Sequence, residues 1–369
     1  MFLQSLQLVN FKNIASAKLD FSSKINCFTG DNGAGKTNIL DAIYYLSFCK
    51  SYFNNVDVQN IKHDEDFFRL AGVYQRGSDK QDSVSCVQQL NHRKQFKLNN
   101  TEYDRLADHI GEFPLVIITP ADSDLIYDGS DARRKYADGV ISQFDKLYLD
   151  DLINYNKVVA QRNMLLKQFH ESHRFNKSSL EIWNEKMKEL GNRIYLKRIE
   201  FVEKFAPIFQ AYYEYITGGK ENVSLVYDSQ LNTMDFDKLL EEALPKDRNF
   251  LYSTAGIHKD DFLFKLGEYP IKKYGSQGQQ KSYLISLKLA QFDYTKKIKG
   301  YKPILLFDDI LDKLDYNRME KLMKLVADEN FGQIFITDTH HLRLADIFKK
   351  INIETNFFDV AGGTINPIN

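Results

Sequence analysis

Short apolar runs separated by turns characterise the first 120 residues of the chain. Residues 83–87 alternate polar with apolar positions, and residues 115–119 form a nearly continuous apolar run that ends at Pro120. Runs of this length, rich in β-branched side chains and bounded by turn residues, predict β-strands. We therefore expect residues 1–120 to form a first lobe of strands around residues 30–37.

The middle of the chain has helical periodicity. Between residues 131 and 209 the only proline is Pro207, and glycine is sparse. Two apolar stripes flank the polar stretch 170–179, which predicts a helical hairpin with about 30 residues, or roughly 45 Å, in each helix. The stripes are formed by Leu152, Tyr155, Val159 and Leu166, and by Trp183, Met187, Leu190, Ile194, Phe201 and Phe205, the second close to a heptad rhythm.

Strand and helix signals alternate again from about residue 250. Residues 303–307 form a continuous apolar run, which is typical of a parallel strand buried on both faces. The spacing of Met319, Leu322, Met323 and Val326 predicts a covering helix, and residues 333–337 predict the next strand. The simplest account is an α/β fold in residues 1–120 and 250–369, split by a helical insertion in residues 121–249.

Composition and charge narrow the class of protein. The chain has 369 residues, of which 43% are hydrophobic and 27% charged, and its net charge is −1. A DNA-binding surface would therefore have to be a local patch. The three cysteines form no C-x-x-C pair, so we expect neither a zinc site nor disulfides. No signal peptide or membrane-length apolar run is evident, and we expect a cytoplasmic protein without a membrane role.

Residues 30–37, with the sequence Gly-Asp-Asn-Gly-Ala-Gly-Lys-Thr, match the phosphate-binding loop G-x-x-x-x-G-K-[ST]. A predicted strand, residues 25–29, precedes the loop, and apolar residues at helical spacing follow it. This order surrounds a phosphate chain with backbone N–H groups and a helix N-terminus. Lys36 is expected to reach the terminal phosphates and Thr37 to ligate Mg²⁺, so the sequence predicts a nucleoside triphosphate site.

Asp308 and Asp309 directly follow the predicted buried strand 303–307. An acidic pair at the end of a parallel strand is what a Walker B element requires. Asp308 can hold Mg²⁺ at the sheet edge where the phosphate loop lies, and Asp309 can orient or deprotonate the attacking water.

A second candidate anion site lies in residues 274–282, where a small polar turn opens a predicted helix. Ser276 and Gly278 offer a hydroxyl group and backbone N–H donors. This turn need not face the phosphate loop of its own chain, and it could face the phosphates held by a second copy.

The phosphate loop, the Ser-Gln-Gly-Gln-Gln turn and the Asp-Asp strand end together resemble the ABC-type ATPase heads of the SMC and Rad50 proteins. Within that group, residues 10–13, 119–135, 155–167 and 256–261 are similar to motifs of the RecF family. The match runs nearly end to end. The resemblance implies an ABC-type P-loop ATPase head interrupted by an inserted α-helical arm domain.

The RecF resemblance also implies a function. Two heads would close face to face on ATP and Mg²⁺ and clamp gapped DNA or single-stranded/double-stranded junctions. With RecO and RecR, the protein would promote loading of RecA and the SOS response, with weak, DNA-stimulated ATP hydrolysis that acts as a switch. The expected nucleotide-binding residues are Lys12, Gly30, Asp31, Asn32, Gly33, Ala34, Gly35, Lys36, Thr37, Asn38, Ser276, Gly278 and Gln279. The expected metal ligands are Thr37 and Asp308, and the expected catalytic residues are Lys36 and Asp309. The candidate DNA contacts come from clusters of basic residues and not from the resemblance; they are Arg133, Arg134, Lys135, Arg162 and Lys167, and such clusters can also be ordinary solvated surface.

Several positions depart from the family pattern. Ile257 stands where proline is usual, and Lys259 replaces an arginine and so loses its bidentate fork. Residues 310–315, which include Lys313, are altered, although Asp315 keeps the expected subunit-facing acid. His340 is a displaced candidate for the γ-phosphate sensor.

Three alternatives to this function remain open. The first is a structural SMC-type tether, for which a 45 Å arm is short. The second is the ATPase subunit of a transporter, for which no heptad-like arm is expected. The third is a binding module without ATPase activity, because Asp309 replaces the glutamate common in ABC heads.

Overall fold

A computed structural model describes residues 1–77, 79–219, 221–309, 316–327, 330–339, 341–351 and 353–368. The chain divides into two compact units. The head unit comprises Met1–Asp122, Tyr215–Gly218 and Leu284–Asn369, and the arm unit comprises Ser123–Glu214 and Gly219–Tyr283. Residues 250–283 therefore lie in the arm unit, whereas the sequence grouped them with the second part of the head. The reason is that residues 261–266 pair as a strand with residues 223–228, which belong to the arm unit.

The head unit contains two six-stranded sheets. The first is antiparallel throughout, because short turns or loops connect most of its neighbouring strands. Its strands, in spatial order, are β2 (Ile14–Asp20), β1 (Phe2–Phe11), β4 (Phe67–Arg76), β5 (Lys80–Gln89), β6 (Gln95–Leu98) and β7 (Thr101–Glu102).

The second head sheet is parallel except for one edge strand. All the side chains of β3, β8, β12 and β13 are buried, which explains why these strands read as continuous apolar runs. In spatial order the sheet contains β15 (Thr364–Ile368, antiparallel), β14 (Thr355–Ala361), β3 (Ile25–Thr29), β13 (Ile334–Asp338), β12 (Ile304–Asp308) and β8 (Leu115–Ile118).

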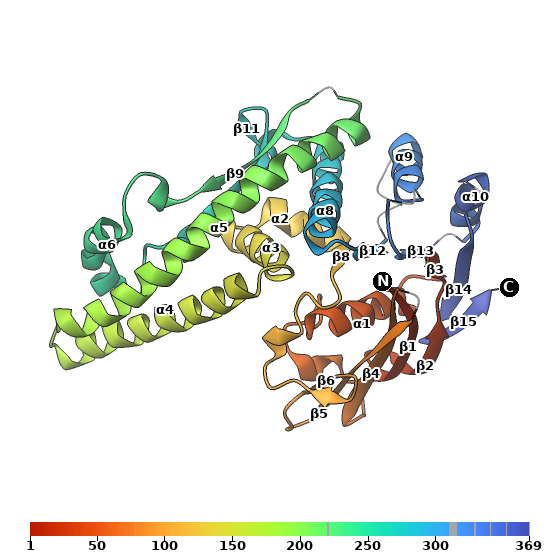
Figure 1. Ribbon diagram of the computed structural model, residues 1–369, viewed down its shortest axis with the longest axis horizontal. Helices are drawn as coiled ribbons and strands as arrows, with labels where there is room; N and C mark the ends of the chain where they lie inside the picture. The colour runs from red at the N-terminus through yellow and green to blue at the C-terminus, as the bar shows by residue number, and fades with distance from the viewer. Residues whose placement is uncertain are drawn as a thin grey trace. The chain divides into compact units, whose positions relative to one another are not determined.

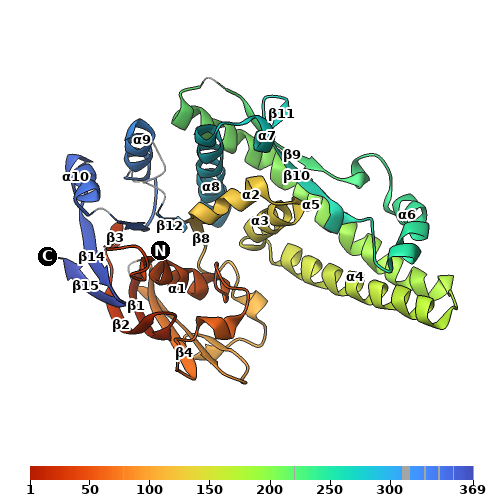
Figure 2. The same cartoon turned by 180° about the vertical axis from the view of Figure 1, so that it is seen from behind.

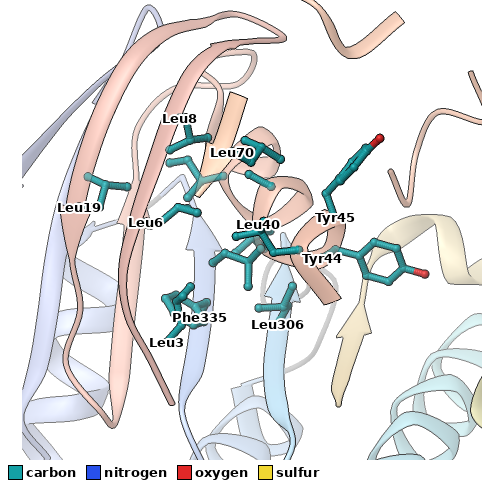
Figure 3. Packing of buried hydrophobic residues seen from close by; sticks show 14 of the residues in the cluster. Leu3, Leu6, Leu8, Leu19, Leu40, Tyr44, Tyr45, Leu70, Leu306 and Phe335 are labelled. Carbon is teal, nitrogen blue, oxygen red and sulfur yellow. The ribbon is translucent and has the colours of Figure 1, made fainter. Parts of the chain in front are cut away.

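Helix α1 (Lys36–Phe48) packs between the two sheets of the head (Figures 1 and 3). Figure 3 shows Leu40 of this helix among Leu6 and Leu8 from the antiparallel sheet and Leu306 and Phe335 from the parallel sheet. All five side chains are fully buried. The start of α1 is thereby held rigidly at the end of β3.

The remaining elements of the head are short connections and covering helices. Among them are α9 (Tyr316–Ala327), α10 (His341–Ile351), and the short helices η1 (Asp57–Asn60), η2 (Leu106–Asp108) and η3 (Pro120–Ser123), the last of which ends at the first arm residue. Helix α8 (Gln277–Lys299) begins in the arm unit and ends in the head unit.

The arm unit is built on an antiparallel helical hairpin, α4 (Lys146–Ser172) and α5 (Lys177–Thr217), which lie side by side in both Figures 1 and 2. Helix α5 has 41 residues, about 60 Å, and is longer than the sequence predicts. It continues because Phe209, Tyr213 and Ile216 extend the buried stripe beyond Pro207.

A small sheet and several shorter helices complete the arm unit. The sheet is antiparallel, in the order β11 (Tyr269–Pro270), β10 (Asp261–Leu266) and β9 (Val223–Asp228). The helices are α2 (Asp124–Tyr127), α3 (Ser130–Ser142), η4 (Gln230–Asn232), α6 (Phe236–Phe250), η5 (Ile257–Lys259) and α7 (Ile271–Tyr274). Within the described residues, no helix is long and apolar enough to cross a membrane.

Candidate functional site

The phosphate loop connects β3 to α1, and its glycines have conformations that other residues rarely adopt. Gly30, Gly33 and Gly35 have φ values of +151°, +80° and +116°. A Cβ atom on Gly30 would lie 2.1 Å from the carbonyl oxygen of Val360, and one on Gly35 would lie 2.8 Å from the side chain of Asn13. The loop therefore needs glycine at these two positions for space as well as for backbone conformation.

Lys36 is the first residue of α1 and is 7% exposed. Its Nζ donates hydrogen bonds to the carbonyl oxygens of Gly30, at 2.6 Å, and Asp31, at 2.8 Å. Both acceptors are neutral, so a phosphate oxygen that enters the loop offers the ammonium group a stronger, charge-assisted bond. Lys36 thus lies where the phosphate-loop lysine is required.

Asp308 ends β12 and faces the start of α1. Its Oδ1 accepts hydrogen bonds from the hydroxyl groups of Thr37 and Thr337, each at 2.8 Å. Burial raises the pKa of this carboxyl group, and the neighbouring Asp309 charge acts in the same direction, whereas the bonds from Thr337 and Thr37 lower it. A hydroxyl and a carboxylate oxygen brought together in this way fit the hard oxygen ligands that Mg²⁺ prefers.

Asp309 lines the same cavity. Its backbone has a φ of +47°, and its N–H donates to the hydroxyl of Thr337 at 3.0 Å. A left-handed conformation is uncommon for a residue other than glycine and often marks a functional position. The cavity measures about 160 Å³ and is lined by Asn32, Gly33, Gly35, Lys36, Thr37, Asn38, Asp308, Asp309 and Thr337.

Thr337 is the residue of this cavity that the sequence did not single out. It follows the apolar run of β13, which is the parallel neighbour of β12. Because parallel strands end at the same sheet edge, its position after that run was the available signal. Ala34 lies beside the cavity, and its carbonyl accepts bonds from Asn13 Nδ2 at 3.1 Å and from the N–H of Gly363 at 3.0 Å.

Lys12 does not line this cavity. Its Nζ lies 2.6 Å from Oδ2 of Asp41, a fully buried carboxylate of α1. The same carboxylate accepts bonds from Ser51 and from the N–H of Tyr52. In this structure the lysine therefore neutralises a buried acid. Asn38, which lines the cavity, donates a hydrogen bond to Asn13 Oδ1 at 2.7 Å.

The Ser276 turn begins α8 within the arm unit. The N–H of Ser276 donates to Gln279 Oε1 at 2.6 Å, and the N–H of Gln279 donates to Ser276 Oγ at 3.3 Å. This reciprocal pair is a capping box, which holds the turn in one conformation. Ser276 is exposed and Gly278 partly exposed, so the helix N-terminus can be approached from solvent.

The cationic residues of α3 differ in their accessibility. Arg133 forms two bonds to the carboxylate of Asp261, at 2.7 and 2.9 Å, and Arg134 donates to the carbonyl of Asp260. Only 14% and 13% of these two side chains is exposed, compared with 78% for Lys135. Lys135 is thus the most accessible cation of the three.

The structure corrects the expectation that Arg162 contacts DNA. Its side chain is 0% exposed, and its Nη1 lies 2.6 Å from Asp247 Oδ2 and 2.8 Å from Ser253 Oγ. Its Nε donates to Asn184 Oδ1 at 2.8 Å. Arg162 therefore joins α4, α5 and α6 inside the arm, where no phosphate can reach it. Lys167, one and a half turns further along α4, is exposed.

Two of the family departures are visible. Ile257 is buried, at 1% exposure, and Lys259 Nζ lies 5.0 Å from the centre of the Tyr252 ring. The candidate sensor His340 and the altered stretch 310–315, with Lys313 and Asp315, lie outside the described residues.

Comparisons with known proteins agree with this geometry. A family model described as the RecF/RecN/SMC N-terminal domain matches residues 2–356. The DNA replication and repair protein RecF of Flavobacterium johnsoniae is 51% identical over 360 residues, which cover 98% of the chain and 100% of that protein. RecF of Phocaeicola vulgatus is 50% identical over 366 residues, covering 99% of the chain and 98% of that protein.

A solved structure of the recombination mediator protein RecF with ATP, from the RecFOR pathway, is also similar. It is 30% identical, superposes with a TM-score of 0.90, and the match covers 100% of the chain and 98% of that protein. The prediction of an ABC-type P-loop ATPase fold is thereby confirmed.

Proposed function

The chain belongs to the RecF family of DNA replication and repair proteins, and from this premise we propose that ATP makes two copies close on DNA. The relative solved with ATP supports nucleotide binding at the phosphate loop. The observation that carries the proposal is the convergence of Lys36, Thr37, Asp308 and Asp309 on one cavity.

Each head residue of the cavity would have a different role in nucleotide binding. Lys36 would leave the carbonyl groups of Gly30 and Asp31 and bond the terminal phosphates. Thr37 and Asp308, whose oxygens lie 2.8 Å apart, would hold Mg²⁺, which would neutralise phosphate charge. Asp309 would orient the attacking water as a general base.

The second copy would complete the site. The exposed Ser276 hydroxyl and the N–H groups at the start of α8 would cap the γ-phosphate held by the facing head. These contacts to the γ-phosphate form only when both heads are together, so ATP favours the closed dimer and hydrolysis releases it. The protein would act as a slow, DNA-stimulated switch.

Closure would hold gapped DNA or a single-stranded/double-stranded junction. Working with RecO and RecR, the protein would then promote loading of RecA and so the SOS response. The competing functions are a structural SMC-type tether and the ATPase subunit of a transporter. A transporter subunit would be found in the membrane fraction, held there by a partner protein.

Sedimentation velocity tests the proposal. The purified protein is run with and without ATP–Mg²⁺, and a parallel cell contains a gapped duplex. We expect ATP-dependent dimers that bind the duplex more tightly, and we expect Lys36→Met to abolish both effects. The exposed Lys24→Met is the matched control and should behave as the wild type.

A monomer that ignores ATP, or duplex binding that Lys36→Met leaves unchanged, would contradict the switch. Phosphate release measured on the same samples separates a slow ATPase from a binding module without hydrolysis.

A further inference from the structure

A second cleft lies in the arm unit, at the loop end of the helical hairpin. It measures about 280 Å³ and is lined by Leu166, Phe169, His170, His173, Phe175 and Arg248. We call it the arm-tip cleft. Helix α6, which carries Arg248, contacts α4, which carries the first three of these residues. Figure 1 shows α6 near the loop end of the hairpin. None of the residues assigned to nucleotide or DNA binding from the sequence lines it.

The walls of the arm-tip cleft are mainly planar side chains. The rings of Phe169 and Phe175 meet edge to face, with centroids 5.3 Å apart. The guanidinium of Arg248 lies 4.3 Å from the centre of the Phe175 ring, and His170 and His173 are both exposed. Flat faces of this kind accept other flat, π-bonded groups by stacking.

The hairpin loop that forms one wall of the cleft carries more cations than carboxylates, although the whole chain is close to neutral. Residues 166–177 contain Lys167, Arg174 and Lys177 and a single carboxylate, Glu171. Lys167 and Arg174 are both exposed. Asp247, next to Arg248, is already neutralised by Arg162 inside the arm. The ligand that fits is therefore anionic as well as planar.

More exposed aromatic rings follow Arg248 along the chain. Phe250 is 55% and Tyr252 43% exposed, and their ring centroids are 5.9 Å apart. Large exposed aromatic side chains in pairs are costly to leave in water and commonly mark binding surfaces. Together with Lys259 over Tyr252, they continue the alternation of cations and rings that begins in the cleft.

We propose that the arm-tip cleft binds single-stranded DNA, with an unpaired base stacked on its rings and Arg248 on a flanking phosphate. Aromatic platforms beside cations are how proteins hold single strands without reading sequence. A duplex satisfies the backbone charge but keeps its bases stacked on one another, so it cannot use the rings. This proposal rests on the proposed function in DNA repair and adds a contact that ATP is not needed to form.

The test uses the full-length protein, without ATP, and a fluorescent oligothymidylate as the probe. Arg248→Gln should lower the slope of log affinity against log salt by about 0.7, the value for one lost phosphate contact on a single strand. Phe175→Leu should weaken binding at least about fivefold, the lower end of the loss of one stacked base. Lys204→Gln and Tyr269→Leu, both at exposed positions of the arm unit, are the matched controls and should change neither quantity.

Photo-cross-linking of the wild type provides a readout that no folding defect affects. An oligonucleotide containing 5-iododeoxyuridine should mark peptides that contain residues 169–175 or 248–252. The proposal would be overturned if the cross-links lay elsewhere in the chain and if Arg248→Gln bound the oligothymidylate with the same affinity and salt dependence as Lys204→Gln. Duplex DNA that competes as well as the single strand would also overturn the proposal. A cleft that no oligonucleotide marks would overturn it too, and would leave an acidic protein as the alternative ligand.

Failure of this inference is distinguishable from failure of the proposed function. Arg248→Gln should retain ATP-dependent dimerisation, whereas Lys36→Met should lose dimerisation but keep the binding of oligothymidylate.

Discussion

The buried ion pair between Arg162 and Asp247 makes a sharp prediction about the arm. The two side chains are 0% and 1% exposed. Replacing Arg162 with methionine keeps most of the side-chain volume but leaves the carboxylate of Asp247 buried without its cation. Breaking a buried pair in this way costs about 3–5 kcal/mol. The opposite oxygen of Asp247 keeps its bonds from the N–H and hydroxyl of Thr254.

Urea unfolding followed by tryptophan fluorescence measures this cost. Trp183 is the only tryptophan in the chain and precedes Asn184, which accepts a bond from Arg162, so it reports on the arm. With a urea dependence of about 1–3 kcal/mol per molar, a loss of 3 kcal/mol lowers the midpoint by at least about 1 M.

Arg193→Met is the matched control, because Arg193 of α5 also forms an ion pair between helices, to Asp151 of α4 at 2.7 Å, but is 48% exposed. An exposed pair contributes at most about 1 kcal/mol. The double variant Arg162→Met/Asp247→Asn should recover part of the loss, since it removes the unpaired charge. The reasoning is refuted if Arg162→Met unfolds at the same urea concentration as Arg193→Met.

Two further predictions concern the nucleotide site. Burial raises the folded-state pKa of Asp308, so the folded protein binds the proton of this carboxyl group more tightly than the unfolded chain does. The protonated group therefore stabilises the fold at low pH, and this stabilisation is lost as pH rises through the folded-state pKa. At neutral pH the charged carboxylate destabilises the folded protein. Asp308→Asn, whose side-chain oxygen can still accept from Thr37 and Thr337, should therefore raise the melting temperature without ligand at neutral pH while abolishing the further rise that ATP–Mg²⁺ produces. Calorimetry with and without ATP–Mg²⁺ tests this, and a lower melting temperature of the variant without ligand would contradict it. Gly30→Ala should eliminate ATP binding, because its Cβ would lie 2.1 Å from the Val360 carbonyl. The Cβ of Gly33→Ala would meet no atom within 4 Å, so this variant should cost only about 1–2 kcal/mol of backbone strain. Equal ATP affinities of the two variants in titration calorimetry would show that the contact with Val360 is unimportant.

The local chemistry of the head could be read from the sequence. The phosphate loop needs only consecutive residues: glycines for left-handed backbone, a lysine and a threonine at the start of a helix. Asp308 and Asp309 were found because a fully buried strand has no polar positions until its end. Both signals are short in range, and the structure places the residues they indicate around one cavity.

The partners of Arg162 and Lys12 could not be predicted from sequence alone, since the partner of each is set by tertiary packing. Asp247 lies 85 residues beyond Arg162, and nothing near either residue in the sequence indicates that they meet. Lys12 is 29 positions from Asp41, which reads as an ordinary polar residue of a helix until its complete burial is seen. A cation in a sequence is equally compatible with a solvated surface, a phosphate contact and a buried ion pair.

The sequence by itself determined the elements whose causes lie within about ten residues: the strands, the paired helices of the arm, the phosphate loop and the acidic strand end. Hydrophobic periodicity and backbone sterics act over that distance. Only the tertiary structure decided which strands are neighbours, that Thr337 joins Asp308, and that Phe169, Phe175 and Arg248 share one cleft. Burial and ion pairing depend on segments far apart in the chain, and folding alone brings these together.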